Sequence, residues 1–119
     1  MTEPGEAERV ADALTRIEEV TPGAAIAARA GGAVTFVDVR EPAEWNLFRI
    51  PGAVHCPIGA LAAQAAATVP ADRDLVTYCS SGSRSALAAD QLRAMGYARV
   101  RSLRGGVRAW MDAGGELED

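Results

Sequence analysis

Residues 79–85 contain the residue types and spacing of a thiolate site. The segment begins with Cys79 and continues through the small residues Ser80, Ser81, Gly82 and Ser83 to Arg84 and Ser85. Small residues allow a backbone to curl tightly with its N–H groups pointing inward. Such N–H groups stabilise a thiolate and bind anions. The segment therefore predicts a cysteine nucleophile inside an anion-binding loop.

The elements on either side of this loop support that prediction. Residues 75–78 form an apolar, β-prone run, and residues 86–95 have the composition of a helix. A helix that begins behind the loop adds unpaired N–H groups and the positive end of its dipole. The order of strand, small-residue loop and helix places Cys79 at the end of a buried strand.

Helices and strands alternate through the rest of the chain, which predicts an α/β fold around a mainly parallel sheet. Ligands of such folds bind beyond the carboxyl ends of the strands. Residues 38–40, Cys79 and residues 104–106 all follow predicted strands, so we expect them to meet at one edge of the sheet. The expected helices cover residues 6–15, 22–29, 42–47, 60–68 and 86–95 and a short stretch around Trp110; the expected strands cover residues 17–20, 34–39, 53–56, 75–78 and 99–103.

Composition limits the classes of function. A chain of 119 residues suffices for one domain, and contents of 49% hydrophobic and 24% charged residues are typical of a soluble globular protein. The net charge of -4 argues against nucleic-acid binding. We expect no membrane partner, because no apolar run approaches the roughly 20 residues of a membrane-spanning helix. A cytoplasmic location is expected, because the first residues lack the pattern of a signal peptide and two cysteines are too few for a disulfide framework.

Four segments resemble the signatures of the rhodanese-like family of single-domain sulfurtransferases. Each is weakly specific alone, but all four in order at suitable spacing are highly specific. The resemblance covers about residues 17–112 and implies a rhodanese-like three-layer fold, with a mainly parallel central sheet flanked by helices. Residues 1–16 would then form an N-terminal helical extension and residues 113–119 a flexible C-terminal tail. The four segments are residues 37–41, residues 44–45 with 50–53, residues 79–85 and residues 103–110.

The resemblance also implies a two-step covalent reaction. The Cys79 thiolate would attack the outer sulfur of a donor such as thiosulfate, and a persulfide would form on Cys79. A thiophilic acceptor, cyanide or a thiol, would then take the terminal sulfur. Neither a metal nor an organic cofactor is implied, and the expected partners are a small sulfur-donor anion and, as an option, a protein persulfide donor or a sulfur-carrier acceptor.

The resemblance makes Cys79 the catalytic residue and assigns substrate binding to the rest of the loop, Ser80, Ser81, Gly82, Ser83, Arg84 and Ser85. Two roles stay open for Arg84, which could hold an anionic donor or fix the loop by pairing with Asp38 or Glu44. Asp38, Arg40, Arg49, Arg104 and Trp110 are expected to support the site. We expect Asp38 and Arg40 to form a hydrogen-bonded pair, Arg104 to add positive potential at the mouth and Trp110 to pack beneath the loop.

One departure from the family pattern lies just before residues 50–53. The family commonly has Gly-His there, whereas this chain has Phe48-Arg49. We expect activity to survive, with Arg49 adding charge to the rim and substrate choice affected. His55 is expected to have a structural, hydrogen-bonded role, and Cys56 is expected to pack in the core.

Other function classes share features with this loop. Cysteine-dependent phosphatases also use a cysteine, a backbone cradle and an arginine, but their loop places five residues between the two, against four here. Some rhodanese-like domains act only as binding or regulatory modules, and many of those lack the cysteine. A sulfur relay from a desulfurase to a carrier protein also fits, because residues 84–86 and 50–53 are similar to rhodanese domains attached to enzymes that activate sulfur carriers.

Overall fold

The computed structural model describes residues 4–119, and its centre is a parallel sheet of five strands. The strands lie in the order β1-β5-β4-β2-β3, and every neighbouring pair is parallel. The α/β fold expected from the sequence is confirmed. The strands are β1 (Glu18–Val20), β2 (Val34–Asp38), β3 (Val54–His55), β4 (Asp74–Tyr78) and β5 (Val100–Leu103).

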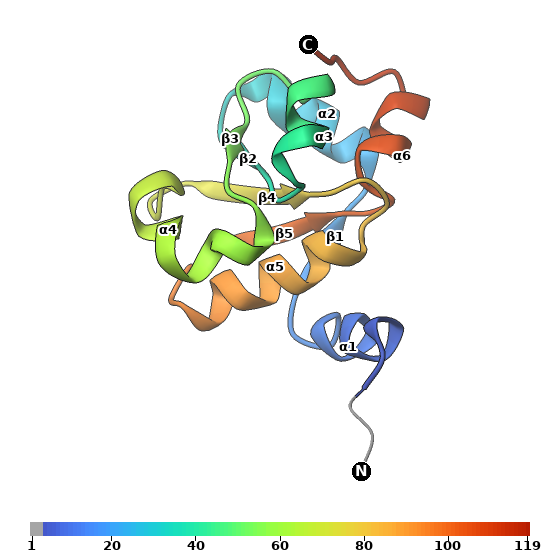
Figure 1. Cartoon of the computed structure of the whole chain (residues 1–119). Coiled ribbons are helices and arrows are strands. Elements are labelled where there is room, and N and C mark those ends of the chain that lie inside the picture. The colour runs from blue at the N-terminus through green and yellow to red at the C-terminus, as the bar shows by residue number, and fades with distance from the viewer. Residues whose placement is uncertain (1–3) are drawn as a thin grey trace.

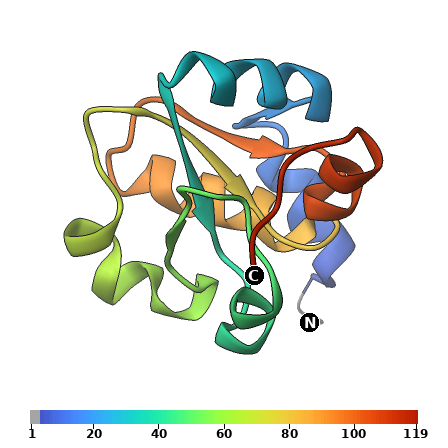
Figure 2. The ribbon, with the colours of Figure 1, turned by 90° about the horizontal axis from the view of Figure 1, so that it is seen from above.

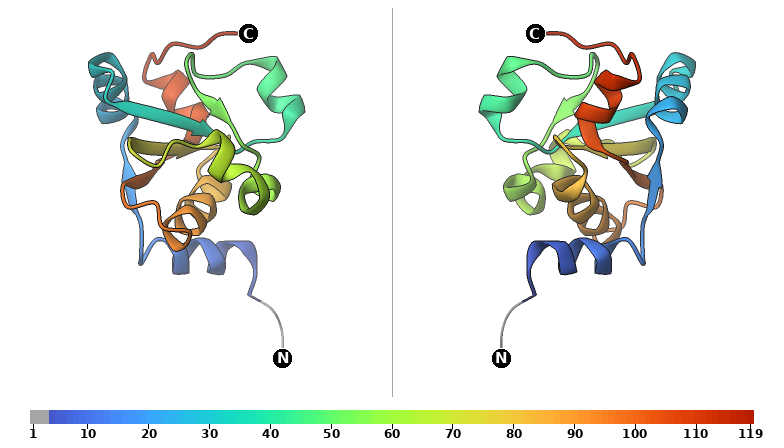
Figure 3. Two further views of the ribbon diagram at one scale, coloured as in Figure 1. Left: turned by 90° about the vertical axis from the view of Figure 1, so that its left-hand side faces the viewer. Right: turned by 90° about the vertical axis from the view of Figure 1, so that its right-hand side faces the viewer.

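Helices cover both faces of the sheet, so the domain has three layers (Figure 1). α2 and α6 pack together on one face, and α4 and α5 pack together on the other. α1 lies on the outer side of α5, away from the sheet (Figure 3). The helices are α1 (Glu6–Ala13), α2 (Pro22–Gly31), α3 (Pro42–Leu47), α4 (Leu61–Thr68), α5 (Ser83–Ala94) and α6 (Gly106–Asp112), and a 3-10 turn, η1 (Ile58–Ala60), precedes α4. None of the helices within residues 4–119 is long and apolar enough to span a membrane.

Local sequence signals explain where two helices begin. The side chain of Thr21 accepts a hydrogen bond from the Ala24 N–H, and Pro22 occupies the first position of α2. At the start of α3, Glu41 and Glu44 each accept from the other's backbone N–H. This capping box fixes the position of Glu44 in the first turn of α3.

The alternation of side chains along β4 explains the orientation of Cys79. Leu75 and Cys79 belong to the core cluster on the face covered by α4 and α5, whereas Val76 and Tyr78 belong to the cluster on the face covered by α2 and α6. Successive side chains of a strand point to opposite faces. Cys79, directly after β4, therefore points to the face on which α5 begins.

The helix after Cys79 begins earlier than expected. The sequence predicts its start at residue 86, whereas α5 begins at Ser83. Gly82 adopts a φ of 107°, in the left-handed region that favours glycine, and turns the chain directly into the helix. Residues 83–85 thus form the first turn of α5, and the loop proper is shorter than expected.

The C-terminal segment has more contacts than the flexible tail expected over residues 113–119. Arg49 and Glu118 exchange two backbone hydrogen bonds of 2.8 and 2.9 Å, next to the end of α3 (Figure 2). The indole N–H of Trp110 donates to the Glu116 carbonyl, and Leu117 packs against the core. These partners are distant in sequence, so composition alone did not indicate them.

Candidate active site

The sulfur of Cys79 lies in a ring of backbone donors at the start of α5. The Gly82 N–H and the Ser85 N–H point at Sγ, with N–S distances of 3.1 and 3.4 Å. The Ser85 hydroxyl lies 3.5 Å from the same sulfur. Cys79 itself is 1% exposed. Two N–H groups and the positive end of a twelve-residue helix thus converge on one thiol.

A chain of buried hydroxyl groups continues from this sulfur into the sheet. The Ser85 hydroxyl lies 2.8 Å from that of Ser102 on β5, and it also donates to the Gly82 carbonyl. The Thr77 hydroxyl donates to the Ser85 carbonyl at 2.8 Å. The sequence analysis did not predict a role for Ser102. The only sequence feature that could have indicated one is a hydroxyl side chain within a run expected to form a strand.

The start of α6 closes the loop from the other side. The Val107 N–H donates to the Cys79 carbonyl at 2.8 Å, and the Arg108 N–H donates to the Ser80 carbonyl at 3.2 Å. Gly106 makes this approach feasible, because a Cβ there would lie 2.5 Å from the Ser80 carbonyl carbon and 2.6 Å from the Cys79 oxygen. Gly106 therefore allows the start of α6 to approach the cysteine loop closely.

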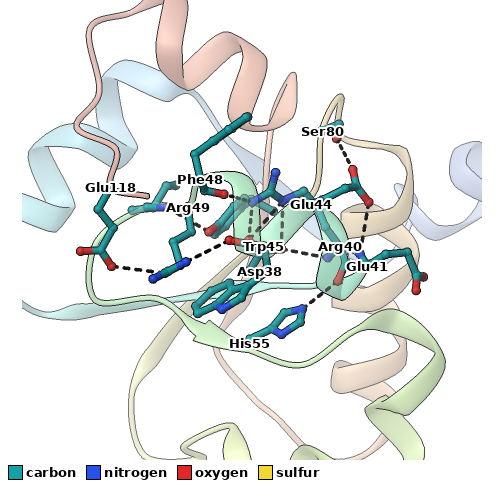
Figure 4. A network of polar contacts seen from close by, with 12 residues as sticks. Asp38, Arg40, Glu41, Glu44, Trp45, Phe48, Arg49, His55, Ser80 and Glu118 are labelled. Carbon is teal, nitrogen blue, oxygen red and sulfur yellow. Dashed lines mark hydrogen bonds and ion pairs between the residues drawn. The ribbon is translucent and has the colours of Figure 1, made fainter.

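Arg84 pairs with Glu44 and not with Asp38. Its guanidinium donates to both carboxylate oxygens of Glu44, at 2.7 and 3.0 Å. The Ser80 hydroxyl donates to the same carboxylate at 2.8 Å (Figure 4). Hydrogen bonding from Arg84 lowers the pKa of Glu44 from 4.5 to about 2. The carboxylate therefore stays ionised at neutral pH, and it ties the loop to α3.

Asp38 and Arg40 form a buried ion pair beyond the end of β2. The Arg40 guanidinium donates to both oxygens of Asp38 and, at 2.6 Å, to the Phe48 carbonyl. His55 lies 2.9 Å from the Arg40 carbonyl through Nε2 (Figure 4). Neither Asp38 nor Arg40 is more than 1% exposed, so the pair shapes the rim from beneath.

The Arg49 side chain contacts Trp45 and Glu118. Its guanidinium lies over the Trp45 ring at 4.7 Å from the centroid, and it pairs with Glu118 at 3.4 Å. Trp45 in turn stacks on His55, with ring centroids 4.7 Å apart. The charge that Arg49 brings is therefore matched by the C-terminal segment, and the expectation of added charge at the rim finds no support in these contacts.

Two other residues lie away from their expected places. Arg104 is exposed and pairs with Glu19 of β1 at 3.2 Å. Trp110 packs edge-on against Phe36, at a centroid distance of 5.3 Å, in the core cluster on the sheet face opposite to Cys79. Trp110 thus anchors the C-terminal segment on that face, and it does not lie beneath the loop. Trp110 belongs to α6, which lies on one face of the sheet, whereas the Cys79 side chain points to the other face.

A hollow of about 200 Å³ adjoins the loop at this edge of the sheet. Polar and apolar side chains share its wall, and its lining residues are Arg40, Glu44, Leu47, Phe48, Ser80, Val107 and Arg108. A second hollow, of about 430 Å³, includes Asp74 and Val100 at the starts of β4 and β5, at the opposite edge of the sheet from Cys79. Ser80 of the cysteine loop lines the smaller hollow, and no residue of the loop lines the second one.

Known proteins share this architecture. The chain is 44% identical over 77 residues to a sulfurtransferase of Allochromatium vinosum, covering 65% of this chain and 71% of that one. It is 36% identical over 81 residues to a probable adenylyltransferase/sulfurtransferase, MoeZ, of Mycobacterium tuberculosis, covering 67% of this chain but only 21% of that protein. A solved structure from Rhodopseudomonas palustris, of a protein of unknown function named as a possible tyrosine phosphatase, matches with a TM-score of 0.89 at 37% identity and covers 99% of this chain and 97% of that one.

The family model described as the rhodanese-like domain matches residues 21–113. This range holds four of the five strands, the cysteine loop and the glycine pair that closes it. The match covers well over half of the chain, and the solved structure that covers nearly all of it has the same fold. The chain therefore belongs to the rhodanese-like domain family.

Proposed function

We propose that this protein is a sulfurtransferase that carries sulfane sulfur from a donor to a thiophilic acceptor through a persulfide on Cys79. The observation that carries the proposal is the pair of backbone N–H groups, from Gly82 and Ser85, that point at Sγ. Relatives named as sulfurtransferases support the reaction class. The unit proposed to do this work is residues 17–112, with residues 1–16 as an extension.

The first step uses the thiolate as a nucleophile. With thiosulfate, Sγ attacks the outer sulfur, a new S–S bond forms, and the bond between the outer sulfur and the sulfonate breaks. The electron pair of that bond leaves with sulfite, so no oxidant or reductant is needed. In the second step the acceptor, cyanide or a thiolate, attacks the terminal sulfur, and the Cys79 thiolate is the leaving group. The two half-reactions predict ping-pong kinetics.

The loop is proposed to stabilise the negative sulfur at both stages. The two N–H groups and the start of α5 favour the thiolate before the first step and again when it leaves in the second. The Ser85 hydroxyl, 3.5 Å from Sγ, adds a third polar contact. Ser80 and Arg84 act by holding the loop through Glu44, because both side chains bind that carboxylate. We propose that the reaction takes place in the cytoplasm, where free thiols such as Cys56 and Cys79 would stay reduced.

A phosphatase is the second candidate, because the Rhodopseudomonas palustris protein is named as a possible tyrosine phosphatase. Phosphate transfer needs an arginine that faces the phosphoryl group. Here the Arg84 guanidinium is held by both oxygens of Glu44. The short loop and this pairing favour sulfur transfer. Hydrolysis of an aryl phosphate by the wild type, lost in Cys79→Ser, would reverse that preference.

The intact mass of the protein after incubation with sulfur donors tests the proposal. Wild type, Cys79→Ser and Cys56→Ala are treated with thiosulfate, with a low-molecular-weight persulfide and with a persulfide-bearing protein. A gain of one sulfur atom is expected in the wild type and in Cys56→Ala, with its loss on adding cyanide and its absence in Cys79→Ser. A wild type that gains no sulfur from any of the three donors would contradict the proposal and leave a binding module.

A further inference from the structure

We infer that the site takes its sulfur from the persulfide of an organic thiol and disfavours a small dianion such as thiosulfate. The inference rests on the proposed function and narrows its donor. Two independent features of the described residues support it. One is how the arginines around the loop are paired, and the other is the apolar part of the adjoining hollow.

Two arginines at the loop, Arg84 and Arg40, are each matched by a carboxylate. Arg84 donates to both oxygens of Glu44, at 2.7 and 3.0 Å. Arg40, which lines the hollow, is buried against Asp38 at 2.8 Å. A guanidinium that is paired in this way offers little net positive charge to an incoming anion. Neither arginine therefore compensates the charge of a dianionic donor.

Two further arginines are paired away from the hollow. Arg104 binds Glu19, and Arg49 binds Glu118. Arg108 is different, because it is exposed, lines the hollow and enters no ion pair within residues 4–119. A dianion beside Cys79 would thus meet one unmatched cation. Opposite charges close together attract strongly at the surface of a protein, so the missing second cation disfavours binding of a dianion.

The wall of the hollow suits a carbon skeleton. Leu47, Phe48 and Val107 contribute apolar surface beside Ser80, and Leu47 is 69% exposed. Apolar groups of a donor gain free energy when they cover such surface and remove it from water. Thiosulfate has no apolar part and gains nothing there. A thiol-borne persulfide presents an apolar stem next to the reacting sulfur.

The transfer balances without a co-reactant. The Cys79 thiolate attacks the terminal sulfur of a protonated persulfide, R–S–S–H. The bond between the two donor sulfurs breaks, and its electron pair leaves on the thiolate R–S⁻. The proton stays on the transferred sulfur, so Cys79 becomes Cys79–S–S–H. The reacting end of the donor is neutral, and the leaving thiolate carries away the charge that Cys79 brought.

The test compares second-order rate constants for loading Cys79 with sulfur. The donors are thiosulfate, glutathione persulfide and a cysteine desulfurase that carries a persulfide. Wild type is expected to load from at least one persulfide donor about ten times faster than from thiosulfate. The ratio between the two persulfide donors then distinguishes a small thiol from a protein as the source.

Charge variants make the comparison specific. Glu44→Gln frees Arg84 and is expected to raise the ratio of thiosulfate loading to persulfide loading about threefold or more, with a gain that shrinks in high salt. Arg108→Gln is expected to lower the same ratio. Asp74→Asn is the matched control, because it also removes one carboxylate from an arginine pair, with Arg99, but at the opposite edge of the sheet. Its ratio is expected to equal that of the wild type.

The outcomes separate this inference from the proposed function. Loading from thiosulfate as fast as from both persulfide donors would overturn the inference and leave the sulfurtransferase proposal standing. A ratio unchanged in both Glu44→Gln and Arg108→Gln would also overturn it. If Glu44→Gln does not fold, the donor ratio of Arg108→Gln alone tests the inference, because a change at an exposed side chain is expected to leave the fold intact. Absence of sulfur on the wild type with every donor would contradict the proposed function itself.

Discussion

The Ser102 hydroxyl on β5 lies 2.8 Å from the Ser85 hydroxyl, which lies 3.5 Å from the sulfur of Cys79. All three residues are buried. Ser85 has one proton to donate, and in this arrangement it donates to the Gly82 carbonyl. When Cys79 loses its proton, the Ser85 proton can turn to the sulfur, while Ser102 donates to the Ser85 oxygen. Ser102 is thus placed to orient a group that contacts the reacting atom.

Replacement of Ser102 by alanine should therefore slow the reaction of Cys79. We expect Ser102→Ala to reduce the rate of alkylation at neutral pH by about fivefold, the factor that corresponds to one net hydrogen bond of about 1 kcal/mol. Ser102→Thr, which keeps the hydroxyl, should recover most of the rate. The measurement is the rate of alkylation by iodoacetamide as a function of pH.

Thr77→Val is the matched control for this prediction. It also removes a buried hydroxyl that contacts Ser85, but that hydroxyl binds the Ser85 carbonyl and not the side chain. We expect Thr77→Val to lower the melting temperature while the alkylation rate stays near that of the wild type. Equal rates in the two variants would show that Ser102 is only structural.

Gly106 should tolerate no side chain. A Cβ there would lie 2.5 Å from the Ser80 carbonyl, and its φ of 64° already disfavours other residues. Gly106→Ala should destabilise the domain by roughly 2–4 kcal/mol and displace the cysteine loop, with loss of sulfur loading. Gly32→Ala distinguishes the steric overlap from the unfavourable φ. Gly32 has a similar φ of 76°, but a Cβ there would have nothing within 4 Å. Urea unfolding that finds equal losses in both variants would assign the effect to backbone conformation alone.

The ion pair of Glu44 with Arg84 should stabilise the domain in a defined range of pH. The folded protein lowers the pKa of Glu44 from 4.5 to about 2. A lowered folded-state pKa adds stability above the unfolded value, and this contribution is lost as the pH falls towards the folded value. The difference in unfolding free energy between wild type and Glu44→Gln should be constant above about pH 5 and shrink from pH 4.5 towards pH 2. Thermal unfolding of both proteins across this pH range measures the difference. A difference that grows on acidification would contradict a stabilising ion pair between Glu44 and Arg84.

The C-terminal segment should contribute to stability. Deletion of residues 115–119 removes the partner of the Trp110 indole N–H, the backbone pairing of Arg49 and the contact of Leu117. We expect a loss of roughly 3 kcal/mol, about the sum of three net hydrogen bonds. Deletion of Asp119 alone is the control. If the longer deletion leaves the unfolding free energy unchanged, residues 115–119 behave as the flexible tail that their composition suggested.

The order of the elements and the position of Cys79 follow from the sequence alone, because both depend on local signals. The Thr21-Pro22 start of α2, the β-branched run over residues 34–38 and the small residues after Cys79 act on their own neighbourhood. Period-two alternation along β4 is local as well. These signals suffice for the parallel α/β fold and for a cysteine at the carboxyl edge of its sheet.

Only the tertiary structure decided which side chains meet there. Glu44 binds Arg84 across 40 residues, and Ser102 reaches Ser85 across 17. These partners depend on the strand order, which places β5 beside β4 and brings α3 to the same edge. The sequence left open whether Arg84 holds an anionic donor or pairs with a carboxylate such as Asp38 or Glu44, and it placed Trp110 beneath the loop. A one-dimensional pattern assigns a residue to an element, but the choice of partner depends on how the elements pack.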